Sequence, residues 1–242
     1  RSNKHLGKLD EAIEAYKQAI AIKPDFEDVY SNMGNALRDQ GKQEEAIEAY
    51  KQAIAIKPDY AEAYYNMGIT FRDQGKLEDA IEAYNKAIAI KPDFEDVYSN
   101  MGNALRDQGK LEDAIEAYKK AISIKPNFAD VYSNMGNALR DQGKLEDAIE
   151  AYNKAISIKP DYAEAYYNMG ITLREQGKLE DAVEIFEKAN KLNPGYSNLV
   201  LSQTLQLLGN YKEAIDVVAW RVNQKSRQFG KSLASWKNGE QK

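Results

Sequence analysis

Five asparagines recur along the sequence at a constant interval of 34 residues, and each stands directly before a Met-Gly pair. They are Asn32, Asn66, Asn100, Asn134 and Asn168. A primary amide carries a hydrogen-bond donor and an acceptor together, so a row of amides can hold the backbone of an extended peptide without reading its side chains. Polar side chains are also commonly bonded within their own protein. The alternative is therefore that each asparagine bonds an adjacent helix, and the spacing fits both interpretations equally.

Residues that could support catalysis or bind a metal ion are scarce or dispersed. The sequence has a single histidine, His5, near the amino terminus, and no cysteine. Serines, acids and bases recur with the interval of 34 residues instead of converging once, and the single glycines form no phosphate-binding loop. We therefore predict a protein that is not an enzyme and that has no cofactor and no metal site.

Composition narrows the possible partners and locations. Of the 242 residues, 43% are apolar, which is enough for a core, and 29% are charged, with a net charge of −5. This mild acidity disfavours nucleic-acid binding, which requires a concentrated basic face. There is no apolar run of about 18 residues and no secretory signal pattern. The sequence thus predicts no membrane span, and with the lack of cysteine it is compatible with a cytoplasmic location.

Prolines and glycines keep the same interval as the asparagines. The prolines are Pro24, Pro58, Pro92, Pro126, Pro160 and Pro194, one glycine row is Gly34, Gly68, Gly102, Gly136 and Gly170, and a second is Gly7, Gly41, Gly75, Gly109, Gly143 and Gly177. A fixed interval of this length is the signature of a repeat protein. The complete repeats are 27–60, 61–94, 95–128, 129–162 and 163–196. A truncated repeat, 1–26, precedes them, and a divergent repeat, 197–224, follows.

Each repeat is predicted to be two antiparallel helices joined by a tight turn. In repeat 61–94, apolar residues at helical spacing indicate a first helix, which the C-cap glycine Gly75 ends. A second apolar stripe follows, and Pro92 ends it. Asp59 precedes Glu62 by three residues, which predicts a capping box at the helix start. A glycine inside a helix costs about 1 kcal/mol against alanine, so we predict that Gly68 faces the second helix, where close approach is needed.

This arrangement resembles the tetratricopeptide repeat family. In repeat 61–94 the family pattern is carried by Tyr64, Met67, Gly68, Phe71, Ala80, Tyr84, Ala87 and Pro92. Tyrosine replaces the usual tryptophan, and methionine replaces the usual leucine. The resemblance extends over residues 1–224 and implies an all-α fold, a right-handed α-solenoid or superhelix of stacked antiparallel helix pairs, whose first helices line a concave groove. Members of the family usually bind proteins or peptides and rarely catalyse reactions.

The resemblance implies that the asparagines face this groove. The phrases "YSNMGN" and "KPDF" are also similar to the repeats of the O-linked N-acetylglucosamine transferases, where an asparagine ladder holds substrate backbone. Besides the five asparagines, the predicted peptide-binding residues are Asn35, Tyr65, Ile69, Asn103, Asn137, Tyr167 and Ile171. Serine, tyrosine and acidic residues replace the bases of the family's chaperone-tail clamp, which argues against that ligand. Arginines near the end of each first helix are expected to complement the helix dipole.

Both ends of the sequence depart from the repeat pattern. A helix is predicted at 9–22 with only half a helix before it, so we expect exposed apolar surface and association between copies through this end. The competing expectation is that residues 1–8 fold back over that surface. At the other end, helices are predicted at 197–208 and 211–224, and the basic segment 225–242 is expected to be either a capping helix or a tether.

The sequence therefore predicts a non-catalytic scaffold that holds an extended protein segment in a groove. Two alternatives stay open. The repeats could be the substrate-recognition arm of a larger enzyme, such as a glycosyltransferase or a sulfotransferase. They could also form a self-assembling repeat array. In each case the predicted partner is a protein or peptide.

Overall fold

The computed structural model describes residues 3–217 and 219, so the predicted tail 225–242 and the end of the predicted helix 211–224 lie outside it. Within this range the chain forms twelve α-helices, followed by a helical stretch over 211–217, and no strand. The predicted all-α class is confirmed. None of the helices in the described range is long and apolar enough to cross a membrane.

The chain divides into two compact units, Arg1–Asn127 and Phe128–Lys242. The first unit contains α1 (Asn3–Ile22), α2 (Glu27–Gln40), α3 (Gln43–Ile56), α4 (Ala61–Asp73), α5 (Leu77–Ile90), α6 (Glu95–Asp107) and α7 (Leu111–Ile124). The second contains α8 (Ala129–Asp141), α9 (Leu145–Ile158), α10 (Ala163–Glu175), α11 (Leu179–Leu192) and α12 (Asn198–Leu207).

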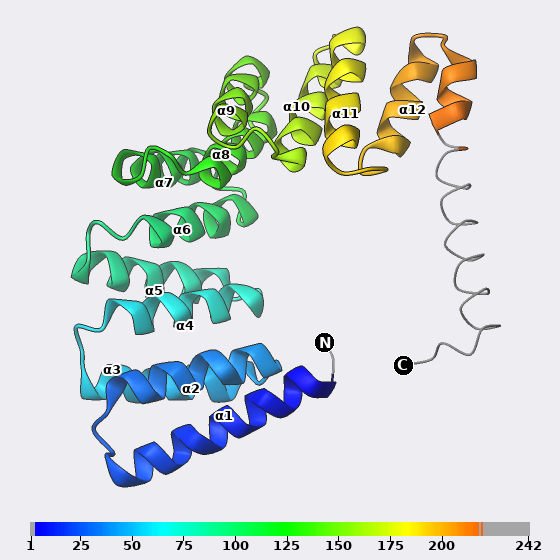
Figure 1. Ribbon diagram of the computed structural model, residues 1–242. Helices are drawn as coiled ribbons and strands as arrows, with labels where there is room; N and C mark the ends of the chain where they lie inside the picture. Colours follow the sequence, from blue (N-terminus) through cyan, green and yellow to red (C-terminus); the bar gives the residue numbers. More distant parts are fainter. Residues whose placement is uncertain (1–2, 218, 220–242) are drawn as a thin grey trace, which may run out of the picture. The chain divides into compact units, whose positions relative to one another are not determined.

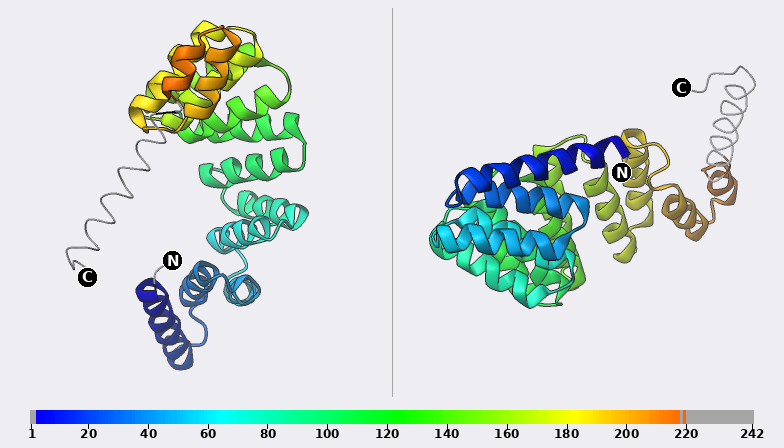
Figure 2. Two further views of the ribbon diagram at one scale, coloured as in Figure 1. Left: turned by 90° about the vertical axis from the view of Figure 1, so that its right-hand side faces the viewer. Right: turned by 90° about the horizontal axis from the view of Figure 1, so that it is seen from below.

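Within each unit, the first and second helices of a repeat pack together, and each pair packs against the next. In the first unit the pairs are α2 with α3, α4 with α5 and α6 with α7, while α1 packs against α2. In the second unit they are α8 with α9 and α10 with α11, and α12 packs against α11. Figures 1 and 2 show the helices of the first unit layered in chain order from α1 to α7. The predicted stacking of antiparallel helix pairs is therefore confirmed.

A buried aromatic ring forms the centre of each helix pair. Tyr84 of α5 is fully buried, and its ring lies directly over Gly68 of α4. A Cβ atom added at Gly68 would lie 2.5 Å from Cε1 of Tyr84, closer than packed carbon atoms allow. The same contact joins Gly34 to Tyr50, Gly102 to Tyr118, Gly136 to Tyr152 and Gly170 to Phe186. The prediction that these glycines face the second helix of the repeat is confirmed. The absence of a side chain makes room for an aromatic ring of that helix.

The second glycine row ends the first helices, with one exception. Gly75 adopts a left-handed conformation, with φ of +75°, in which glycine meets no steric penalty. Its N–H donates to the carbonyl oxygen of Arg72 at 2.8 Å. Gly7 does not end a helix, because α1 runs without a break from Asn3 to Ile22, so the predicted start at residue 9 is wrong.

The predicted capping boxes are absent from the described helices. The N-cap of α4 is Tyr60, one residue after Asp59, and no side chain caps the helix. The turn after α3 brings the N–H of Tyr60 to the carbonyl oxygen of Lys57, at 3.2 Å, which delays the helix start by one residue. The Tyr60 ring instead packs below the ammonium of Lys57, 5.1 Å away. An aromatic residue stands at this position directly before each complete repeat, namely Phe26, Tyr60, Phe94, Phe128 and Tyr162.

A glutamine row links successive repeats at the turn. Nε2 of Gln108, after α6, donates to the carboxylate of Glu78 in the first turn of α5, at 2.7 Å. Equivalent bonds join Gln40 to Asp10, Gln74 to Glu44 and Gln176 to Glu146, over 2.7 to 3.2 Å. Because the two partners lie 30 residues apart, each bond connects one repeat to the preceding one. The sequence alone does not predict this contact.

Apolar side chains are partly uncovered at both ends of the described chain. In α1, Ile13 is buried, whereas Leu9, Ala12, Tyr16 and Ile20 are half-buried. The predicted apolar face of α1 is thus covered only in part, and association through it stays a prediction. In the last repeat, Ser202 of α12 replaces the helix-facing glycine, and large apolar side chains are exposed at Leu199, Leu207, Tyr211 and Ile215.

Candidate functional site

The candidate site is the asparagine face of each unit, defined by Asn32 of α2, Asn66 of α4 and Asn100 of α6 in the first unit, and by Asn134 of α8 and Asn168 of α10 in the second. Each asparagine occupies the same position of its first helix. Asn32 is exposed, and the other four are half-buried. The environment of their amides decides between the two interpretations of the row.

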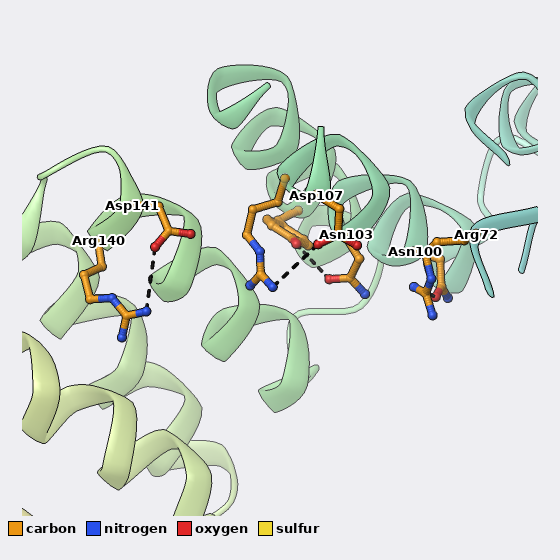
Figure 3. A network of polar contacts seen from close by, with 8 residues as sticks. Arg72, Asn100, Asn103, Asp107, Arg140 and Asp141 are labelled. Carbon is orange, nitrogen blue, oxygen red and sulfur yellow. Dashed lines mark hydrogen bonds and ion pairs between the residues drawn. The ribbon is translucent and has the colours of Figure 1, made fainter. Parts of the chain in front are cut away.

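Asn100 is fully engaged inside the protein. Its Oδ1 accepts a hydrogen bond from Nη1 of Arg72 at 2.9 Å. Figure 3 labels both residues. Its Nδ2 donates to the hydroxyl of Tyr65 at 2.9 Å and to the carbonyl oxygen of Asp96 at 3.0 Å. Arg72 and Tyr65 belong to α4, so the amide of Asn100 bridges two repeats. At this position the amide is already bonded within the protein, as the structural interpretation expects, and its predicted role in peptide binding stays a prediction.

The other four asparagines differ from Asn100. Within residues 3–217 and 219, the side-chain amides of Asn32, Asn66, Asn134 and Asn168 have no hydrogen-bond partner in the protein. Each amide therefore keeps both its donor and its acceptor for a ligand or for solvent. The predicted binding role of these four residues stays a prediction.

The predicted groove residues Asn35, Asn103 and Asn137 have a structural role that the sequence analysis missed. Oδ1 of Asn103 accepts a hydrogen bond from the buried hydroxyl of Tyr118 at 2.8 Å, and Figure 3 includes this bond. Asn35 pairs with Tyr50, and Asn137 with Tyr152, also at 2.8 Å. Each bond joins the two helices of one repeat and satisfies a tyrosine hydroxyl that burial would otherwise leave unpaired.

A pattern in the sequence could have revealed this pairing. Isoleucine replaces asparagine at Ile69 and Ile171. In the repeat of Ile171 the aromatic residue is Phe186, which has no hydroxyl group. In the repeat of Ile69 it is Tyr84, whose buried hydroxyl has no partner among the described residues. The asparagine thus accompanies tyrosine in three repeats, and one repeat keeps the tyrosine without it.

Two further predicted site residues, Tyr65 and Tyr167, lie in aromatic clusters. The ring centre of Tyr65 is 5.0 Å from that of Phe94 and 6.3 Å from that of Tyr84. Burial is the main cause that raises the pKa of Tyr65 to about 12. Tyr167 lies 5.1 Å from Tyr196 and 6.0 Å from Phe186. Both tyrosines are half-buried, so they support the packing of their repeats while keeping some exposed surface.

One arginine lies in the last turn of each first helix. A positive charge at this place interacts favourably with the helix dipole. Arg106 lies 3.9 Å from the carboxylate of Asp107, and Arg140 lies 3.7 Å from that of Asp141. Figure 3 shows the pair of Arg140 and Asp141. Ion pairs of this length between partly exposed side chains contribute little to stability. Arg72 differs, because it reaches the amide of Asn100.

A hollow of about 670 Å³ opens between α5, α6 and α7. Its lining includes apolar atoms of Ile81, Met101 and Leu105, with Tyr98 and Lys120 among its polar residues. Tyr98 and Met101 flank Asn100 in sequence but project from a different side of the helix. This hollow is therefore separate from the asparagine face. The described residues contain no cluster of three side chains that could hold a metal ion.

Comparison with known proteins identifies the repeats. A family model described as TPR repeat matches residues 5–37, 34–71, 68–105, 102–139 and 136–174, and one described as Tetratricopeptide repeat matches 163–196. No curated protein sequence matches the chain.

Solved structures share the fold. A crystal structure of MamA is 32% identical and covers 66% of this chain and 94% of its own, with a TM-score of 0.62. YrrB, described as a TPR protein with an unusual peptide-binding site, is 24% identical and covers 76% and 95%, with a TM-score of 0.62. PilF of Pseudomonas aeruginosa is 20% identical and covers 94% and 99%, with a TM-score of 0.68. The family matches span most of the sequence, and the chain belongs to the tetratricopeptide repeat family.

Proposed function

We propose that this chain is a non-catalytic scaffold that binds an extended segment of a partner protein along the asparagine face. The observation that carries the proposal is the set of four asparagine amides without a partner in the described part of the chain. Two of them, Asn32 and Asn66, lie 34 residues apart in the first unit, and the other two, Asn134 and Asn168, lie 34 residues apart in the second. A primary amide can pair with both the N–H and the C=O of a peptide backbone. A row of such groups therefore suits a ligand that is itself a repeating backbone.

The comparisons support a ligand of this kind. YrrB shares the fold and is described as having a peptide-binding site. The two predicted groove positions beside each asparagine differ between repeats. Repeat 27–60 has Ser31 and Asn35 there, whereas repeat 61–94 has Tyr65 and Ile69. Such variation gives the partner side chains different surroundings along the face, while the amides that hold the backbone stay constant.

A library of displayed, unstructured peptides provides a test that needs no known partner. The intact chain should enrich peptides that bind in extended form. The variant in which Asn66, Asn134 and Asn168 are all alanine should bind the enriched peptides at least tenfold more weakly, since each lost hydrogen bond contributes about 0.5–1.5 kcal/mol. Its melting temperature should stay close to that of the parent, because these amides bond nothing inside the protein.

Two controls complete this experiment. Asn100→Ala should lower the melting temperature, since it breaks the bonds to Arg72 and Tyr65. Lys119→Ala with Lys120→Ala, beside the separate hollow of α7, should leave peptide binding unchanged. Peptides that bind the triple variant as tightly as the parent would refute the proposed role of the asparagine face.

A further inference from the structure

The hollow of about 670 Å³ between α5, α6 and α7 has an apolar lining to which all three helices contribute. This lining consists of Ile81, Met101, Leu105 and Ala117. A smaller hollow of about 230 Å³ lies two repeats earlier, between α1, α2 and α3, and has the equivalent lining Ile13, Met33, Leu37 and Ala49. Binding sites in proteins are usually hollows of about 300–1,000 Å³ with an apolar lining. The larger hollow has the size of such a site.

The repeat between these two hollows shows which group fits the space. Repeat 61–94 has Phe71 at the position of Leu105. Phe71 packs against the core cluster that contains Met67. Met67 is buried, whereas its equivalent Met101 is half-buried. A large apolar side chain thus covers the lining within repeat 61–94, and a side chain of similar size from a partner fits the uncovered lining beside Leu105.

The second unit shows the same relation at another position of the lining. Ile185 of α11 stands where α7 has Ala117. Met169 of α10, the equivalent of Met101, is buried. A larger apolar side chain at either position therefore accompanies a buried methionine. The repeat that contains Met101 has the smaller residue at both positions.

Four charged side chains of α7 border the larger hollow, in the chain order Asp113, Glu116, Lys119 and Lys120. All four are exposed, and none has an ion-pair partner among residues 3–217 and 219. The equivalents of Glu116 and Lys120 behave differently in α5, where Nζ of Lys86 lies 2.6 Å from the carboxylate of Glu82. The two acids and two bases of α7 are therefore available to opposite charges on a partner.

The order of these charges selects the direction of a partner helix. Asp113 and Lys120 are separated by about 10 Å along the axis of α7. A helix favours acidic residues in its first turn and basic residues in its last turn. If such a helix lies antiparallel to α7, its acidic first turn meets the two lysines and its basic last turn meets Asp113 and Glu116. A parallel helix would need the reverse order, against its own dipole.

We propose that this hollow is a second docking site, which binds an amphipathic helix of a partner protein antiparallel to α7. The partner helix places a large apolar side chain, of the size of phenylalanine or leucine, on the lining that Phe71 covers one repeat earlier. Acidic and basic residues about seven positions apart on the partner helix match the charges of α7. The site is separate from the asparagine face and does not depend on the proposed function.

The test uses the five methionines as reporters, because each complete repeat contains one. The probe is a blocked, alanine-rich helical peptide of about 15 residues. It has glutamates in its first turn, lysines in its last turn, and leucine and phenylalanine one turn apart between them. In the ¹³C-methyl NMR spectrum we expect a saturable shift of Met101 and constant signals of Met67 and Met169. An unchanged Met101 signal, or equal shifts of Met67 and Met101, would overturn the proposal.

Substitutions that the chain already carries in another repeat close the hollow. Leu105→Phe copies Phe71, so it should weaken binding of the peptide at least tenfold while the melting temperature stays constant. The matched control Leu37→Phe, at the smaller hollow, should leave the affinity measured at Met101 unchanged. Peptide binding that survives Leu105→Phe would refute the hollow as the site.

Two further measurements test the charges and the kind of occupant. Lys119→Ala with Lys120→Ala should weaken peptide binding about threefold at low salt and have no effect at high salt. An unchanged affinity at low salt would contradict the antiparallel arrangement. A Met101 signal that shifts as the protein concentration rises, without peptide, would identify a second copy as the occupant and overturn the proposal. Because this peptide does not require the asparagine face, the result is separate from that of the library experiment.

Discussion

Tyr118 and Tyr84 occupy the same position in successive repeats, but only Tyr118 has a side-chain acceptor, Asn103. Tyr118→Phe removes that bond and leaves Asn103 unpaired, so we expect the free energy of unfolding to fall by about 1–2 kcal/mol. Tyr84→Phe removes a buried hydroxyl without a protein partner, and stability should stay constant or rise. Urea unfolding of both variants compares them directly. Equal losses would show that an ordered water serves Tyr84.

The glycine beneath each ring makes a second prediction at the residue scale. In Gly102→Leu, the new Cβ would lie 2.5 Å from Cε1 of Tyr118, whose ring is fully buried and cannot move aside. Overpacking of this kind costs about 1–3 kcal/mol. The midpoint of urea unfolding should therefore fall. A variant as stable as the parent would mean that the ring has an alternative position in the core.

The buried tyrosines also predict how stability depends on pH. Burial, as the largest cause, raises the pKa of Tyr50 and of Tyr152 to about 12. An unfolded tyrosine titrates near pH 10. Between about pH 10 and 12 the unfolded chain therefore binds fewer protons, so stability is complete below about pH 10 and is lost as the pH rises. Melting temperatures across this range, together with phenolate absorbance, measure the effect. A constant melting temperature would contradict it.

At the element scale, the spacing of residues predicts the helices well, but it predicts the side-chain contacts between helices of different repeats poorly. Gly75 and Pro92 mark helix ends through local backbone chemistry, which the sequence states directly. Gly7 occupies the same repeat position as Gly75 but lies inside the continuous helix α1, so the repeat position alone does not fix where a helix ends. The hydrogen bonds of the Asn100 side chain cannot be predicted from the sequence for another reason. Tyr65 and Arg72 lie 35 and 28 residues away, so only the packing of α4 on α6 brings them together.

The glutamine row allows the coupling between helices to be measured. Gln108 and Glu78 join the end of α6 to the start of α5 at 2.7 Å. Because this hydrogen bond is exposed to solvent, the pair should contribute about 0.5 kcal/mol, near the lower limit for a hydrogen bond. A double-mutant cycle of Gln108→Ala and Glu78→Ala isolates this energy. Strictly additive single and double variants would show that the bond does not couple the two repeats.

At the scale of the whole molecule, repeat proteins are stabilised by contacts between neighbouring repeats, so a helix face that no neighbouring helix covers exposes apolar surface. Tyr16 of α1 is only half-buried, whereas the equivalent ring of Tyr50 is fully buried over Gly34. In the last repeat, Leu207 and Ile215 are each 66% exposed. Surfaces of this kind commonly mark contact sites.

We therefore predict that copies of the chain associate, and that the contact involves the face of α1. If one end binds the other, the contact is heterologous and can continue into an open fibre, whereas paired α1 faces would close as a dimer. Sedimentation over a range of concentrations distinguishes these outcomes. Extending the chain by a first helix that covers Tyr16 should abolish association through α1, and Ile215→Lys should block only the end-to-end form. A monomer at every concentration, with and without the added helix, would refute the prediction while leaving the repeat fold intact.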